Sequence, residues 1–203
     1  MGVMNNIVAQ NSDYLFMIES ACKAPSGHNT QPWLFKIGAS EIDIYPDFSK
    51  ELPIVDPSHR ELFVSLGCAT ENLCIAAHEK GYHTEVKVIE NSFIRVLLTE
   101  GKEKLPDSLL FPQIAVRQTN KRVYNGEAIP ESTINILKMV PIEPSVSIHF
   151  YRNGTVDYDT IAGWVYAGNH LQMNDEAFKT ELTDWMRYNK KQQDNARDGL
   201  SYA

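Results

Sequence analysis

One segment of the sequence, residues 56–81, constrains the fold more than any other. Asp56 and Pro57 are typical of a helix start, and Gly81 is typical of a helix end. Between them, apolar residues recur at helical spacing and predict one buried helix face. The residues of this stripe are Leu62, Leu66, Ala69, Leu73, Ala76 and Ala77. We therefore expect a core helix against which the rest of the chain packs.

Pairs of short segments with strand character flank this helix on both sides. Residues 33–37 and 41–45 precede it, with a Gly-Ala-Ser turn between them, and residues 84–89 and 93–99 follow it. Strands that neighbour each other in sequence pair most readily as hairpins. Because helices and strands mix without strict alternation, the pattern favours the α+β class, with a mixed, mostly antiparallel sheet flanked by helices.

The remaining patterns complete a single expected domain over residues 1–203. Helical periodicity spans 13–24, 109–116, 130–139 and 157–188, the last with a break at Asn174 and Asp175. Residues 146–151 alternate as a strand, and the polar residues 189–203 predict a loop or tail. Residues 100–106 are the best candidate for a hinge, and the three cysteines are expected to be small core residues.

Charge and missing motifs exclude several classes of function. The chain has 19 Lys and Arg residues against 26 Asp and Glu, a net charge of −7, which argues against nucleic acid as the main partner. No apolar run approaches the roughly 18 residues of a membrane span, and no secretory signal is visible. We therefore expect a cytoplasmic protein without a membrane partner. No spacing of His or Cys predicts a metal site, and no Gly-rich phosphate loop occurs.

Residues 24–33 are the first of two segments with more polar chemistry than a turn requires. Ser26, Asn29 and Gln31 lie here between a predicted helix and a predicted strand. In extended backbone Asn29 and Gln31 project to the same side. Paired carboxamides suit a planar heterocycle, because each offers a donor and an acceptor. The alternative is a polar loop whose side chains satisfy backbone groups.

Residues 117–124 are the second such segment. They include Arg117, Thr119, Lys121 and Arg122 in a chain that is acidic overall. Arginine binds phosphate with two parallel bonds, threonine adds a short donor, and lysine adds a mobile charge. The segment predicts a site for one phosphate group. The alternative is a solvated basic loop.

Both segments resemble motifs of the nitroreductase superfamily of FMN-dependent oxidoreductases. The first, APSGHNTQPW, resembles the superfamily's APSxxNxQPW segment, and the second, RQTNKRVY, resembles its Arg-rich phosphate motif. In most nitroreductases the Arg-rich motif comes first, whereas here it comes second. That order resembles the Acg-like branch of internally duplicated homologues, as do residues 56–61, 67–73, 181–187 and 198–200. Members of that branch are much longer, so the resemblance implies a C-terminally shortened chain or a site completed by a partner subunit.

The resemblance implies a nitroreductase-like fold, a homodimer and an FMN cofactor. Arg117, Thr119, Lys121 and Arg122 would bind the phosphate and ribityl oxygens, with Lys121 also near the N1 and C2 carbonyl edge. The pyrimidine edge and the region of N5 and O4 would contact Ser26, Asn29 and Gln31. NAD(P)H would supply electrons to a small-molecule acceptor such as a nitroaromatic or a quinone, and no side chain is assigned a catalytic role. Two alternatives are a flavin-storing protein without useful turnover and a remnant that keeps only the fold.

Overall fold

The computed structural model describes residues 2–90, 92–101, 103–120 and 123–201. The chain divides into two compact units. Unit 1 combines residues 1–117 with 176–203, and unit 2 consists of residues 118–175. Residues 100–106, the expected hinge, lie inside unit 1, where Gly101 and Leu105 donate backbone hydrogen bonds to the carbonyls of Gly81 and His78.

Unit 1 contains a four-stranded antiparallel sheet in the order β1-β2-β4-β3. The strands are β1 (Trp33–Ile37), β2 (Glu41–Pro46), β3 (Tyr82–Ile89) and β4 (Phe93–Glu100). Both predicted hairpins form, since β1 pairs with β2 and β3 pairs with β4. The α+β class and the antiparallel sheet with flanking helices are therefore confirmed.

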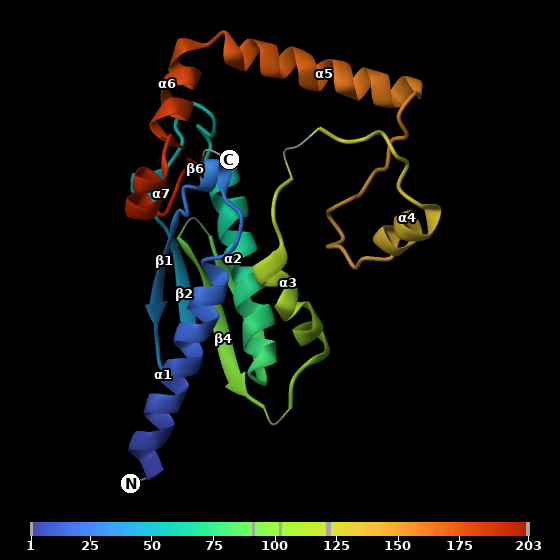
Figure 1. Ribbon diagram of the computed structural model, residues 1–203. Coiled ribbons are helices and arrows are strands. Elements are labelled where there is room, and N and C mark those ends of the chain that lie inside the picture. The colour runs from blue at the N-terminus through green and yellow to red at the C-terminus, as the bar shows by residue number, and fades with distance from the viewer. Residues whose placement is uncertain (1, 91, 102, 121–122, 202–203) are drawn as a thin grey trace. The chain divides into compact units, whose positions relative to one another are not determined.

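Helix α2 (Arg60–Glu79) packs on this sheet beside α1 (Gly2–Ala21), as Figure 1 shows. All six residues of the predicted stripe on α2 are buried. They meet Ile42, Ile44 and Val96 from the sheet, and Tyr14 and Met17 from α1. The predicted core helix is thus confirmed, and Gly81 ends it with a φ of 80° that few other residues adopt.

The starts of both long helices differ from the prediction. Helix α2 begins at Arg60 after the N-cap residue His59, instead of next to Pro57. Asp56 still stabilises its first turn, since Asp56 Oδ2 accepts from the backbone N–H of Leu62 at 2.9 Å. Helix α1 begins at Gly2, well before the start predicted at residue 13. Asp13 therefore lies within the helix, where its side chain contacts Lys80 at 3.1 Å and accepts a hydrogen bond from Tyr82.

The C-terminal residues of unit 1 are more ordered than predicted. Helix α6 (Glu176–Asp184) ends before residue 188, and β5 (Met186–Arg187) follows it. The expected tail forms α7 (Lys190–Ala196) and β6 (Leu200–Ser201), which pairs in parallel with β5. Polar composition misled the prediction because these residues are held by backbone hydrogen bonds to distant parts of the chain, which composition does not reveal.

The short elements of unit 1 agree with the patterns in outline. The 3₁₀ helix η3 (Pro106–Leu110) and α3 (Phe111–Val116) cover the helix predicted at 109–116. Two further 3₁₀ helices, η1 (Gly27–Asn29) and η2 (Phe48–Lys50), lie in loops. Of the cysteines, Cys74 is buried, whereas Cys22 is exposed, so the expectation of three core cysteines is wrong for Cys22.

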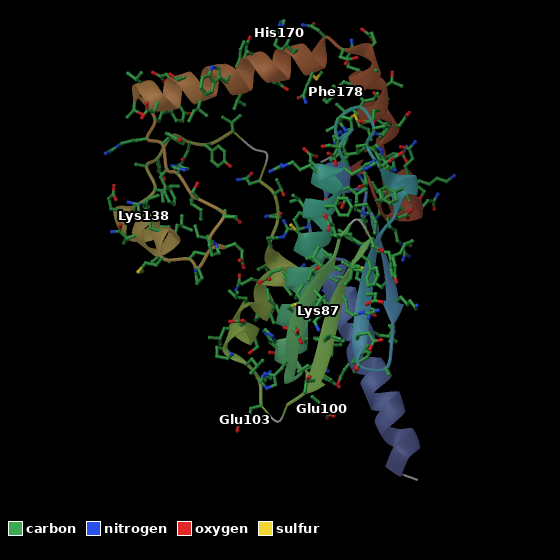
Figure 2. All side chains as sticks on the ribbon, turned by 180° about the vertical axis from the view of Figure 1, so that it is seen from behind. Lys87, Glu100, Glu103, Lys138, His170 and Phe178 are labelled. Atoms are coloured by element: carbon green, nitrogen blue, oxygen red, sulfur yellow. The ribbon has the colours of Figure 1, made fainter. Side chains whose placement is uncertain are left out.

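Unit 2 contains α4 (Glu131–Lys138) and α5 (Val156–Met173), which carries His170 in Figure 2. The predicted break after α5 is confirmed at Asn174. The strand predicted at 146–151 is wrong, because a strand needs a neighbouring strand and the described residues of unit 2 contain none. No residue that the structure describes in unit 2 is buried.

Candidate functional site

The loop at 24–33 joins α1 to β1 and is fixed at its far end. Thr30 is 2% exposed, and Pro32 and Trp33 are buried. The carbonyl of Pro32 accepts from the backbone N–H of Asp47 at 3.1 Å, which ties the loop to the residue after β2. Trp33 belongs to the hydrophobic core of unit 1. The polar side chains of the loop are thus next to residues that are anchored in the core.

The backbone of this loop is strained at the residues that carry its chemistry. His28, Asn29 and Gln31 have positive φ values of 48°, 55° and 55°. Asn and His tolerate this conformation better than most residues, whereas for Gln31 it costs about 1 kcal/mol, and strain of this kind concentrates at functional sites. The expected extended backbone at Asn29 and Gln31 is therefore wrong, although their two carboxamides do reach the same neighbour.

That neighbour is the segment 197–199, which we call the C-terminal strap. Asn29 Nδ2 donates to the carbonyl of Gly199 at 2.9 Å, and the backbone N–H of Gly199 donates back to the Asn29 carbonyl at 3.0 Å. Gln31 Nε2 donates to the carbonyl of Arg197 at 2.6 Å. Asn29 and Gly199, which are 170 positions apart in sequence, are therefore in direct contact at this loop.

Ser26 holds the loop from within. Its Oγ accepts from the backbone N–H of Gln31 at 3.0 Å, while its carbonyl accepts from the N–H of Asn29. Asn29 is exposed, whereas Gln31 and Ser26 are half-buried. The structure thus brings together all three residues that the sequence predicted in this loop.

Opposite charges fix the strap in turn. Asp198 Oδ1 lies 2.7 Å from Arg187 Nη2, and Asp198 Oδ2 lies 3.4 Å from Lys50 Nζ. Next to it, Gly199 has a φ of 79°, and a Cβ there would lie 2.4 Å from the Trp185 carbonyl oxygen. Only glycine fits such a close approach, so the strap has one well-defined path past β5.

The Arg-rich segment crosses the boundary between the two units. Arg117 is exposed at the end of unit 1, where its Nη2 donates to the carbonyl of Lys23 at 3.4 Å. Lys23 immediately precedes the loop at 24–33, so Arg117 contacts the residue before this loop. Thr119 is exposed in unit 2, and Lys121 and Arg122 lie outside the described residues.

Sequence reasoning did not assign a role to Lys50, Arg187 and Asp198. Arg187 and Asp198 lay within segments that resemble the Acg-like branch, but no local pattern connects them to Asn29 or Gln31. The Asp-Gly pair at 198–199 is a turn signal that could have marked the strap as more than a tail.

A cavity of about 740 Å³ lies beside the strap in unit 1. Its lining includes Ser49, Ile54, Thr180, Trp185, Arg187 and Asp198. A cavity of this size can hold a small ligand. The described residues of the two predicted motifs do not line it.

Two further observations concern the residues that the structure describes. Among them, no group of three or more His, Cys, Asp and Glu side chains is arranged to hold a metal ion. Nor does any helix among them have the length and apolar character that crossing a membrane requires.

Comparison with known proteins gives two related matches. Proteins from two strains of Mycobacterium tuberculosis, both provisionally named NAD(P)H nitroreductase, are 30% identical to this chain over 170 residues. The match covers 81% of this chain but 48% of each relative, so the chain spans about half the length of these curated relatives. No protein-family model matches the chain.

Proposed function

We propose that this chain belongs to the nitroreductase superfamily and binds FMN for two-electron transfer. The electron donor is NAD(P)H, and the acceptor is a nitroaromatic, a quinone or a similar small molecule. The similarity to the two mycobacterial proteins supports the oxidoreductase class and the use of NAD(P)H. The proposal of FMN comes from the two motifs.

The observation that carries this proposal is the strained loop with its paired carboxamides. Asn29 and Gln31 adopt positive φ values and both donate through their amide nitrogens to one backbone segment. The oxygen and the second N–H of each carboxamide remain for a ligand, and a planar heterocycle with alternating donors and acceptors fits them. Arg117 beside Lys23 presents an exposed guanidinium, which fits a phosphate group. The residues present are therefore suited to FMN.

Each motif residue receives a proposed role. Ser26, Asn29 and Gln31 hold the pyrimidine edge and the region of N5 and O4. Arg117, Thr119, Lys121 and Arg122 hold the phosphate and ribityl oxygens. Lys121 also places a cation near the N1 edge, where it favours the reduced, negatively charged form. When bound, FMN would supply the hydride acceptor and donor, so the side chains need only bind, orient and tune it.

We also propose that the protein forms a homodimer. Helix α5 exposes large apolar side chains, with Trp164 71%, Val165 67% and Leu171 72% exposed. In Figure 2, side chains project from α5 along its length. Several large apolar side chains exposed on one helix are typical of an interaction site. Burial of α5 against a second copy would remove these side chains from water.

The test of the function uses purified protein loaded with FMN. We expect retention of the flavin after gel filtration, loss of its visible absorbance on anaerobic addition of NAD(P)H, and recovery on addition of a nitroaromatic or a quinone. Retained flavin that NAD(P)H never bleaches would instead identify a storage protein. A protein that binds no flavin would contradict the whole proposal.

Arg117→Ala tests the phosphate site separately. Loss of a charge-assisted hydrogen bond should weaken FMN binding by about 1.5–3 kcal/mol, which is roughly 10- to 100-fold in dissociation constant. Titration followed by flavin fluorescence measures the change. Arg152→Ala, which removes an exposed arginine from outside both motifs, serves as the control and should leave the affinity unchanged. Unchanged affinity in Arg117→Ala would refute its role.

A further inference from the structure

We propose that the C-terminal strap positions the flavin-binding carboxamides, with Asp198 as the residue that fixes it. In this arrangement the side-chain oxygens of Asn29 and Gln31 face the ligand and accept a hydrogen bond from an imide N–H. The inference rests on the proposed function, and it assigns a role to residues outside both motifs.

The orientation of the two carboxamides follows from their partners. A carbonyl oxygen only accepts hydrogen bonds, so the groups that face Gly199 O and Arg197 O must be the amide nitrogens. The oxygen of a planar carboxamide lies on the other side of the group from its nitrogen. Among the described residues, no donor bonds to Asn29 Oδ1 or Gln31 Oε1 in the structure. The loop therefore presents acceptors to a ligand.

Acceptors select for a ring that carries an N–H. The pyrimidine edge of a flavin has one such donor, N3–H, between two carbonyls. If the carboxamides could rotate freely, they would offer nitrogen or oxygen equally well and would not discriminate. Because the strap occupies one N–H of each carboxamide, the position of the oxygen is fixed, and each group offers this acceptor together with its second N–H. That arrangement matches an N–H that lies next to a carbonyl.

The strap holds this orientation only while it stays in place. Its carbonyls belong to residues 197 and 199, on either side of Asp198. The contacts of Asp198 with Arg187 at 2.7 Å and with Lys50 at 3.4 Å join it to β5 and to the 3₁₀ helix η2. Arg187 and Asp198 have side-chain exposures of only 16% each, so this pair is partly shielded from water. Removal of the carboxylate should free the strap and, with it, the two carboxamides.

The experiment compares FMN with N3-methyl-FMN, in which a methyl group replaces the donor hydrogen. Dissociation constants are measured by flavin fluorescence for the wild type, Asp198→Ala and the isosteric Asp198→Asn. Asp194→Ala is the matched control, since it removes an exposed carboxylate from α7 just before the strap. Circular dichroism of each variant checks that the fold is kept, and Asp198→Asn preserves the shape of the site if Asp198→Ala does not fold.

We expect the wild type and Asp194→Ala to prefer FMN over the methylated analogue by roughly tenfold, the scale of one lost hydrogen bond. In Asp198→Asn and Asp198→Ala this preference should shrink to about twofold or less. A role in folding alone would weaken both flavins equally and leave their ratio unchanged. A ratio near one in the wild type, or an unchanged ratio in both Asp198 variants, would overturn the proposal.

A second measurement needs no flavin. In the apo protein, amide hydrogen exchange at residues 24–33 should become faster in both Asp198 variants and should stay unchanged in Asp194→Ala. Unchanged exchange in the Asp198 variants would contradict the role of Asp198 in holding the loop. Failure of the wild type to bind FMN would refute the proposed function itself, whereas binding without discrimination would refute only this inference.

Discussion

Asp43 and Arg95 form an ion pair that joins two neighbouring strands of the sheet. They lie opposite each other on β2 and β4, and Asp43 accepts from Arg95 through both oxygens, at 2.7 and 2.8 Å. Asp43 is 3% exposed, so its charge would be costly without this partner. The hydrogen bonds from Arg95 lower the pKa of Asp43 below its ordinary value.

This pKa shift predicts a pH-dependent stability. Because the folded state lowers the pKa of Asp43, the pair stabilises the protein above the ordinary pKa of about 4 and loses this effect as the pH falls through the lowered value. Asp43→Asn should therefore destabilise the protein at pH 7, and its difference from the wild type should shrink below about pH 4. Urea unfolding at several pH values measures this. A difference independent of pH would contradict it.

Leu66 tests the core that the sequence predicted. Its side chain is fully buried on α2, whereas Val64 on the same helix is 54% exposed. Leu66→Ala should cost about 3 kcal/mol of unfolding free energy, since it removes apolar contacts and leaves a cavity. Val64→Ala should change it by less than about 0.5 kcal/mol. Chemical denaturation measures both, and equal effects would contradict the assignment of the buried face.

At the scale of secondary-structure elements, one kind of substitution should have opposite effects in α2 and in the strap. Gly67 lies in α2, and a Cβ added there would have no neighbouring atom within 4 Å, so Gly67→Ala should stabilise the helix by about 0.5–1 kcal/mol. Gly199 has a positive φ and no room for a Cβ, so Gly199→Ala should destabilise unit 1 by at least about 1 kcal/mol.

Thermal or chemical unfolding of the two variants, side by side, measures this contrast. A destabilising Gly67→Ala would contradict the open position described for Gly67 in α2. A stabilising Gly199→Ala would contradict the close approach to the Trp185 carbonyl in particular.

At the scale of the whole molecule, the two units differ in how much they bury. Unit 1 has a contiguous core of α1, α2 and the sheet, while the described residues of unit 2 include none that is buried. A helix with exposed apolar side chains, such as α5, gains little stability from its own unit. Its stability should therefore depend on a partner.

Amide hydrogen exchange at several protein concentrations tests this dependence. Amides of α5 should exchange much faster than those of α2 in dilute protein, and they should become protected as the protein self-associates. Sedimentation of the same samples gives the oligomeric state. Protection of α5 equal to that of α2 in a monomer would contradict the proposed homodimer.

Local patterns in the sequence were sufficient for elements whose stability comes from periodic burial. The stripe on α2 repeats with the geometry of a helix, and the segments of β1 to β4 are neighbouring pairs with strand character, so the fold class and the two hairpins could be predicted. The strand expected at 146–151 failed because alternation alone does not supply a pairing partner. The residue types of the proposed site could be proposed from the sequence, because paired carboxamides and clustered cations limit the chemistry they can perform, and their roles stay a prediction.

The contacts that these site residues make depend on the tertiary structure. Their positions in the sequence are enough to place Asn29 and Gln31 in one loop, but only the folded chain shows that both amide nitrogens face the strap. It also brought Lys50, Arg187 and Asp198 together. Hydrogen bonds between residues far apart in sequence leave no periodic signal, because they depend on how packed elements place the chain and not on the neighbours of each residue.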